Sequence, residues 1–164
     1  GGWGTVVGQG AGDNALNMAG AADAIVENIV VDPNNTNNGI IGASNRMIVR
    51  LVKAQDTNGN SYQFSSSVPV GILILGCAFL GNSNGLYLSG GNRCRVVGTY
   101  NQNSGVNLQI IDGSPADNVL TGNVFQDGSY STSGANDVYV GNRIDGGFSA
   151  AASATYAAND VEAF

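Results

Sequence analysis

Short apolar runs, separated by polar turn residues, recur along most of this chain. From residue 23 onward each run ends at a position where the chain is expected to bend. Successive bends lie 19 to 25 residues apart. Runs of three to six residues are too short for independent hairpins, whereas a solenoid takes such strands from every coil into parallel sheets. The bend positions are Asn28, Leu51, Gly76, Gly98, Gly122 and Gly141, and a second set of runs lies at 39–41, 62–64, 85–88 and 105–110.

The two clearest copies of the repeat are residues 116–125 and 135–144. Each places Gly-Asn at the bend, and Gly and Asn both tolerate left-handed backbone conformations. In this register Asn123 and Asn142 are expected to stack about 4.8 Å apart in adjacent coils, with Thr99 and Cys77 continuing the column. Stacked amides can hydrogen-bond along such a column, which explains the preference for Asn.

Composition excludes several classes of protein. The chain has 164 residues, the length of one domain, and its charged share of 11% is less than half the usual value. A net charge of −6 without any basic run disfavours a nucleic-acid partner. No run approaches the ~20 apolar residues of a membrane helix, so membrane insertion is not expected.

The chemistry available to the chain is restricted. It has no His and only two cysteines, Cys77 and Cys94, which do not form a convincing zinc site. We therefore expect no metal and no other cofactor. The two thiols fall in different columns of the repeat, so buried free cysteines are favoured over a disulfide. Any acid–base chemistry would have to use carboxylates, Tyr or Lys.

Both faces of several runs are apolar, as in 72–75 (Ile-Leu-Ile-Leu) and 29–31 (Ile-Val-Val). Alternation along a strand would place about half of these side chains outside the coil. Loops or other protomers could cover them. An apolar exterior of this size is unusual for a monomer, and this favours other protomers.

Three segments, 85–92, 118–125 and 137–144, resemble the coils of right-handed parallel β-helices of the pectate-lyase-like kind. Within that superfamily, the composition is similar to that of bacteriophage tailspikes and related virion appendages. The resemblance covers roughly residues 23–147 and implies an all-β, right-handed parallel β-helix of about six coils. Residues 1–22 would form a Gly- and Ala-rich first coil or cap, and residues 148–164 an Ala-rich cap or arm.

The same resemblance implies a homotrimer on a virion, with other virion proteins as partners and a host-surface polysaccharide as ligand. A secreted or cell-surface location is the alternative. Three functions remain open: a non-catalytic tailspike, fibre or decoration module, a polysaccharide depolymerase fragment (hydrolase or lyase), and a rigid adhesin or scaffold. The missing His, the short chain and the low charge favour the first.

Carboxylates are the only credible catalysts if the chain is an enzyme, since a glycosidase needs two of them on one face. Each Asp has an alternative role in forming a turn. Tyrosines could form platforms for sugar rings or could belong to the core. The catalytic candidates are Asp117, Asp137, Asp127 and Asp145, and the ligand-binding candidates are Tyr87, Tyr100 and Tyr139.

Overall fold

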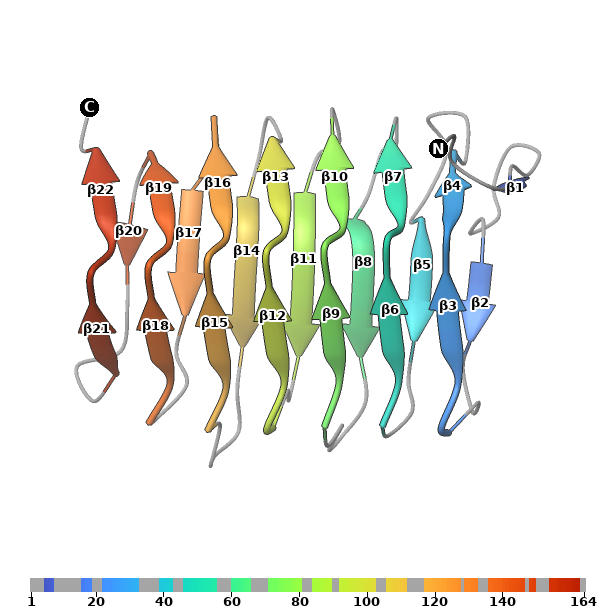
Figure 1. Ribbon diagram of the computed structural model, residues 1–164, viewed down its shortest axis with the longest axis horizontal. Coiled ribbons are helices and arrows are strands. Elements are labelled where there is room, and N and C mark those ends of the chain that lie inside the picture. Colours follow the sequence, from blue (N-terminus) through green and yellow to red (C-terminus); the bar gives the residue numbers. More distant parts are fainter. Residues whose placement is uncertain are drawn as a thin grey trace.

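The computed structural model of the chain contains strands, and no helix occurs in the part that it describes (Figure 1). All strand pairs in that part are parallel, as in the pairing of Val96 with Leu120 and of Leu120 with Tyr139. The described residues are 5–7, 16–18, 22–32, 39–42, 46–55, 60–65, 71–80, 84–89, 92–102, 106–111, 117–127, 129–132, 136–146, 148–149 and 154–162.

The chain passes repeatedly through three sheets, here named A, B and C. Each passage, which we call a coil, places one strand in sheet C and the next in sheet A. A strand of sheet B then returns in the opposite direction (Figure 1). The all-β, parallel arrangement expected from the sequence is confirmed, and it is compatible with a parallel β-helix.

The strands of each sheet follow one another along the long axis of the molecule. Sheet A contains β1 (Thr5–Val7), β4 (Ile29–Val31), β7 (Lys53–Gln55), β10 (Ala78–Leu80), β13 (Tyr100–Gln102), β16 (Val124–Gln126), β19 (Arg143–Asp145) and β22 (Asp160–Glu162). Sheet B contains β2 (Leu16–Met18), β5 (Ile40–Gly42), β8 (Asn60–Ser65), β11 (Asn84–Ser89), β14 (Val106–Ile111), β17 (Ser129–Thr132) and β20 (Phe148–Ser149). Sheet C contains β3 (Ile25–Glu27), β6 (Ile48–Arg50), β9 (Leu73–Leu75), β12 (Arg95–Val97), β15 (Val119–Thr121), β18 (Val138–Val140) and β21 (Thr155–Ala157).

Left-handed residues make the bend from sheet C to sheet A. The six bend positions expected from the sequence all have positive φ, between 52° and 62°, and this confirms the predicted register. Ala158 makes the same bend after β21. A second column of bends precedes sheet C and consists of Asp23, Arg46, Gly71, Arg93, Asp117 and Asn136.

Replacing Gly122 tests whether the bend needs only a left-handed backbone. A Cβ atom added to Gly122 would meet nothing within 4 Å, so the effect comes from the backbone alone. We expect Gly122→Val to lower the free energy of unfolding by about 1–2 kcal/mol, because a β-branched residue strongly resists positive φ. Gly122→Asn should cost much less, since Asn28 makes the same bend. Equal losses for both variants in urea unfolding would contradict this explanation.

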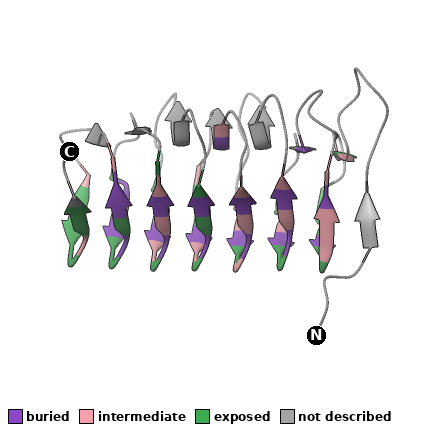
Figure 2. Cartoon of the chain, turned by 90° about the horizontal axis from the view of Figure 1, so that it is seen from above, coloured by how far each residue is buried: buried purple, intermediate pink, exposed green. Residues whose placement is uncertain are grey.

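The core lies between the sheets, and the middle residue of most strands in sheets A and C points into it; β4 is an exception, since Val31 rather than Val30 is buried there. Buried and half-exposed positions alternate along the strands of sheets A and C, as in the buried Leu120 between the half-exposed Val119 and Thr121. Figure 2 shows buried residues recurring at corresponding places in successive coils. The largest fully buried side chains are Tyr139, Phe79, Phe125, Ile40, Met47, Ile72, Ile74 and Leu86.

Candidate functional site

A buried ladder of amides runs along the bend between sheets C and A. The side-chain oxygen of Asn123 accepts hydrogen bonds from the Thr99 backbone N–H at 2.9 Å and from the Thr99 hydroxyl at 3.0 Å. The Asn142 oxygen accepts in the same way from the backbone and side-chain nitrogens of Asn123, at 3.0 and 2.9 Å. The Asn159 oxygen accepts from both nitrogens of Asn142. The predicted Asn column is therefore confirmed, and it continues into the last described coil.

Each Asn side chain of the ladder also donates a hydrogen bond to the backbone of the preceding coil. The side-chain nitrogen of Asn123 donates to the Val96 carbonyl oxygen, and that of Asn142 donates to the Leu120 carbonyl oxygen. Every such Asn thus joins three coils and replaces the backbone pairing that is interrupted at the bend. Buried polar groups with all partners present support a unique register, whereas missing partners are costly.

A second, shorter ladder lies at the bend that precedes sheet C. The Asn118 side-chain oxygen accepts from the Cys94 backbone N–H, and the Asp137 carboxylate accepts from the Asn118 N–H at 2.9 Å. The Tyr139 hydroxyl donates to the other Asp137 oxygen at 3.0 Å. Asp137 and Tyr139 are both 0% exposed, so solvent does not reach either side chain in this conformation.

The structure separates Asp117 from Asp137. Asp117 is exposed and stands beside Asn136, whose amide nitrogen lies 3.4 Å from an Asp117 carboxylate oxygen. Asp137 is aligned with Asn118 inside the coil. The two carboxylates belong to neighbouring positions of the repeat, one facing solvent and one facing the core.

Asp127 and Asp145 instead belong to one polar surface on the outside of sheet A. Asp127 is exposed and accepts from the Gln102 side-chain nitrogen at 2.8 Å. Asp145 is 8% exposed and accepts from the Arg143 guanidinium at 3.0 Å. We call this surface the sheet A face; it consists of Tyr100, Gln102, Gln126, Asp127, Arg143 and Asp145.

Tyr100 is the aromatic group of the sheet A face. Its hydroxyl donates to the Gln126 side-chain oxygen at 2.8 Å, and the residue is 37% exposed. Of the other tyrosines predicted to bind ligand, Tyr139 is buried and Tyr87 in β11 is half-buried. Among these three, Tyr100 is therefore the one that presents its ring on the same face as the exposed Gln102 and Asp127.

Gln102 and Gln126 were not singled out from the sequence, although the repeat contains the signal. Both lie four residues after their bend glycines, Gly98 and Gly122, as Asp145 does after Gly141. Register pairing joins these positions directly, because Gln102 pairs with Gln126 and Gln126 pairs with Asp145. Alignment of the coils at this offset would have predicted a continuous polar column.

The outside of sheet C is apolar. In the four strands β9, β12, β15 and β18, six of the eight outward positions carry branched apolar side chains, and Leu75 and Val140 are 39% and 37% exposed. Charged residues are confined to Arg95 and, at one end, to the ion pair between Arg50 and Glu27. We call this surface the sheet C face; it consists of Leu73, Leu75, Val97, Val119, Val138 and Val140.

Both cysteines are buried free thiols, which confirms that they do not form a disulfide. Burial raises the pKa of Cys77 and of Cys94 from 9.0 to about 11, against smaller opposing contributions from backbone hydrogen bonds. Thiolate, the reactive form, is thus disfavoured in the folded chain, and neither thiol is suited to nucleophilic catalysis near neutral pH.

These raised pKa values predict a loss of stability in alkali. Below pH 9 both states keep the thiol protons; between pH 9 and about 11 the unfolded chain releases them first, so stability falls as pH rises. The expected loss by pH 11 is about 2–3 kcal/mol per thiol. Urea unfolding at several pH values should show this loss in the native chain and a smaller one in a Cys77→Val, Cys94→Val variant. Identical pH dependence in both would contradict it.

Within the described ranges, no three His, Cys, Asp or Glu side chains gather closely enough to hold a metal ion. The same residues contain no helix that is long and apolar enough to cross a membrane. Comparison of the chain with protein-family models, with curated protein sequences and with solved structures gave no match.

Proposed function

We propose that this chain is a structural and host-attachment module of a bacteriophage virion, such as part of a tailspike, fibre or decoration protein. In this proposal it forms a right-handed parallel β-helix, and three copies associate through the sheet C face. The sheet A face binds a polysaccharide of the host surface. The observation that carries the proposal is the division of the exterior into one apolar face and one polar face with an exposed Tyr.

The apolar side of this division supports self-association. Leu75, Val97 and Val140 form one outward column with Thr121, and Leu75 and Val140 of this column are exposed. Large contiguous apolar surfaces of this kind mark interaction sites in soluble proteins. A second copy of the same chain is the favoured occupant because repeating coils present matching surfaces over the same length. The virion assignment itself comes from the resemblance of the coil sequences.

The polar side supports carbohydrate binding. Tyr100 offers an apolar ring with a polar edge, the kind of group that packs on the apolar face of a sugar. The amides and carboxylates around it lie on three adjacent strands and can exchange their mutual hydrogen bonds for bonds to sugar hydroxyls. Pairs such as Gln102 with Asp127 already hold these side chains in place, which reduces the entropy lost on binding.

Binding of host polysaccharides should depend on Tyr100. We expect Tyr100→Ala to weaken binding to capsule or O-antigen polysaccharide by about tenfold or more, because the ring provides the apolar contact. Tyr100→Phe keeps the ring and should retain most of the affinity. Lys53→Ala, in the same outward column of sheet A but outside the cluster, is the matched control. Biolayer interferometry on immobilised glycans measures these affinities, and unchanged affinity in Tyr100→Ala would contradict the assigned site.

A polysaccharide depolymerase is the second candidate, and the placement of Asp127 and Asp145 on one face favours it. The exposed Asp127 would be the carboxylate that meets substrate, and Asp145, 8% exposed, would be the second carboxylate of the same face. Incubation of the purified chain with capsule or O-antigen should then release reducing ends, and Asp127→Asn should abolish the release. Asp117→Asn, which changes an exposed carboxylate outside the sheet A face, is the control and should remain active. No release by the native chain would support the non-catalytic function.

A further inference from the structure

The sheet A face carries one negative charge in excess. It contains two carboxylates, Asp127 and Asp145, and one cation, Arg143. The Arg143 guanidinium lies 3.0 Å from an Asp145 oxygen, so these two charges balance each other. Asp127 is exposed, and among the described residues no Lys or Arg forms an ion pair with it. A ligand on this face therefore meets the Asp127 carboxylate without a counter-charge.

Most of the cationic side chains of the molecule lie on another surface. Four of the six Lys and Arg residues are in sheet C or at the bend that precedes it: Arg46, Arg50, Arg93 and Arg95. On sheet A, Lys53 belongs to β7, two strands away from Tyr100 in β13, which is about 10 Å. This separation exceeds the screening length of about 8 Å at physiological salt. Lys53 would therefore attract an anion bound at Tyr100 only weakly.

Hydrogen bonds within the sheet A face leave an acceptor exposed next to Tyr100. The Tyr100 hydroxyl donates to Gln126, and the Gln102 side-chain nitrogen donates to one Asp127 oxygen, both at 2.8 Å. The second carboxylate oxygen of Asp127 accepts from none of the described residues. Sugar hydroxyls can donate to this oxygen, whereas an ionised carboxylate or a fully ionised phosphate group has no proton to donate.

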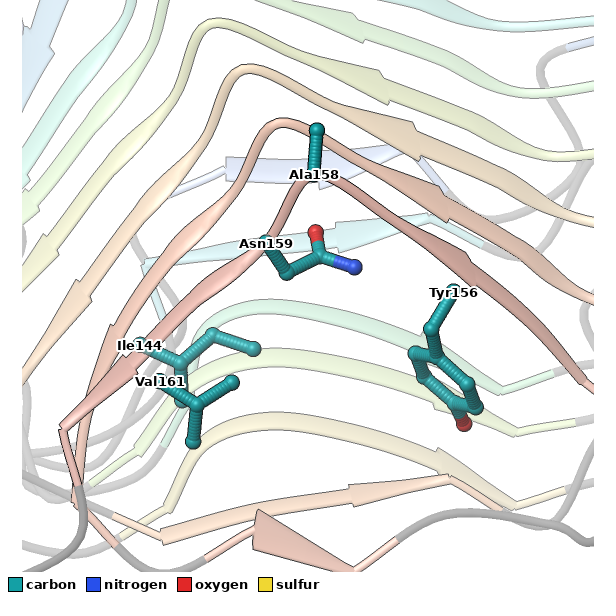
Figure 3. Close-up of a pocket in the computed structure, with 5 residues that line it drawn as sticks. All are labelled: Ile144, Tyr156, Ala158, Asn159 and Val161. Carbon is teal, nitrogen blue, oxygen red and sulfur yellow. The ribbon is translucent and has the colours of Figure 1, made fainter.

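A cavity of about 300 Å³ beneath the bend between β21 and β22 is separate from this face (Figure 3). Tyr156, Asn159, Ile144 and Val161 point toward it from both sides of the bend, whereas Ala158 points away. None of these five residues is charged, and Ile144 is buried inside the coil. Selection of a ligand by its charge is therefore expected on the outer surface of sheet A and not in this cavity.

We infer that the sheet A face binds a neutral polysaccharide, and that Asp127 selects it against polymers bearing uronic acid, sialic acid or phosphate groups. This inference rests on the proposed glycan binding and adds the class of glycan. A hydroxyl of a neutral sugar donates a charge-assisted hydrogen bond to Asp127, which is stronger than a bond between neutral groups. An anionic sugar instead brings a like charge to the same place, and such repulsion is a source of specificity.

An array of immobilised bacterial polysaccharides, neutral ones beside ones with carboxylate or phosphate groups, tests the class of ligand. Binding that is lost in Tyr100→Ala should occur with neutral polymers, and it should be at least about tenfold stronger than with any anionic one. For the strongest binder, the Kd should change less than about twofold between roughly 0.02 and 0.5 M NaCl, because no ion pair with the ligand is formed.

The variant Asp127→Asn tests the selecting residue. The change keeps the size of the side chain and removes its charge, so the affinity for the neutral polymer should fall about fivefold or more. The ratio of neutral to anionic affinity should fall as well. Asp117→Asn removes the same charge from an exposed residue outside the sheet A face and is the matched control. Its affinities should equal those of the native chain.

Two results would overturn the inference while leaving glycan binding at Tyr100 intact. The first is Tyr100-dependent binding of an anionic polymer that weakens about tenfold or more over the same salt range, since an ion pair would then hold the ligand. The second is equal affinity of Asp127→Asn and the native chain for the neutral polymer. An array without any Tyr100-dependent binding would contradict the proposed function itself, and the inference would fall with it.

Discussion

Replacing Asn123 by Leu is expected to lower the free energy of unfolding by about 2–5 kcal/mol. The Thr99 N–H and the Thr99 hydroxyl would both lose the Asn123 oxygen that accepts their hydrogen bonds, in a position that water does not reach. The Val96 carbonyl oxygen would lose a donor as well. Because folded domains have a net stability of only about 5–15 kcal/mol, this variant should lie close to the limit of folding.

The same column provides the control for Asn123→Leu. Cys77 occupies the equivalent place two coils earlier, and Val52 occupies it one coil before that. Cys77→Val exchanges small apolar side chains and should change stability by less than about 1.5 kcal/mol. Guanidinium unfolding, followed by far-ultraviolet circular dichroism, compares the two variants. A loss below 1 kcal/mol for Asn123→Leu would mean that the ladder contributes little beyond packing.

Placing two carboxylates on the sheet C face is expected to convert the proposed trimer into monomers. Leu75→Asp combined with Val140→Asp would bury six unpaired charges in the assembled trimer, each at a cost of several kcal/mol. The folded monomer should tolerate the change, because both side chains are exposed there. Sedimentation velocity at micromolar concentration should show one species of monomer mass with a native circular dichroism spectrum.

The matched control for the double Asp variant introduces two Asp residues on a different sheet. Ala78→Asp with Gln126→Asp adds two acidic residues on the outside of sheet A, and the oligomer should survive. If both double variants dissociate equally, added negative charge rather than the sheet C face would explain the effect. If neither dissociates, another surface holds the copies together.

The periodicity of the sequence was sufficient to predict the coils and the amide column. Gly122 and Gly141 mark the bend directly, and Leu51 could be aligned with them only through the spacing of the runs. The left-handed φ of 52° at Leu51 shows that position in the repeat determines the backbone there, against the preference of a branched side chain. Local propensity alone would not have placed a bend at Leu51.

The sequence was less informative about which side chains face outward. Asp117 and Asp137 differ by one position relative to their bends, and one position along a strand exchanges the inner and the outer face. The cluster around Tyr100 depends on contacts between residues of different coils, such as Gln102 with Asp127. Such contacts become visible only when the offset from the bend is compared coil by coil.

The mass of the native chain in solution tests the proposed assembly most directly. Sedimentation equilibrium or light scattering on the purified chain should give three times the chain mass of 16.6 kDa, because the sheet C face would be buried between copies. A stable species of 16.6 kDa across the micromolar range would contradict the proposal that this face joins three copies of the chain.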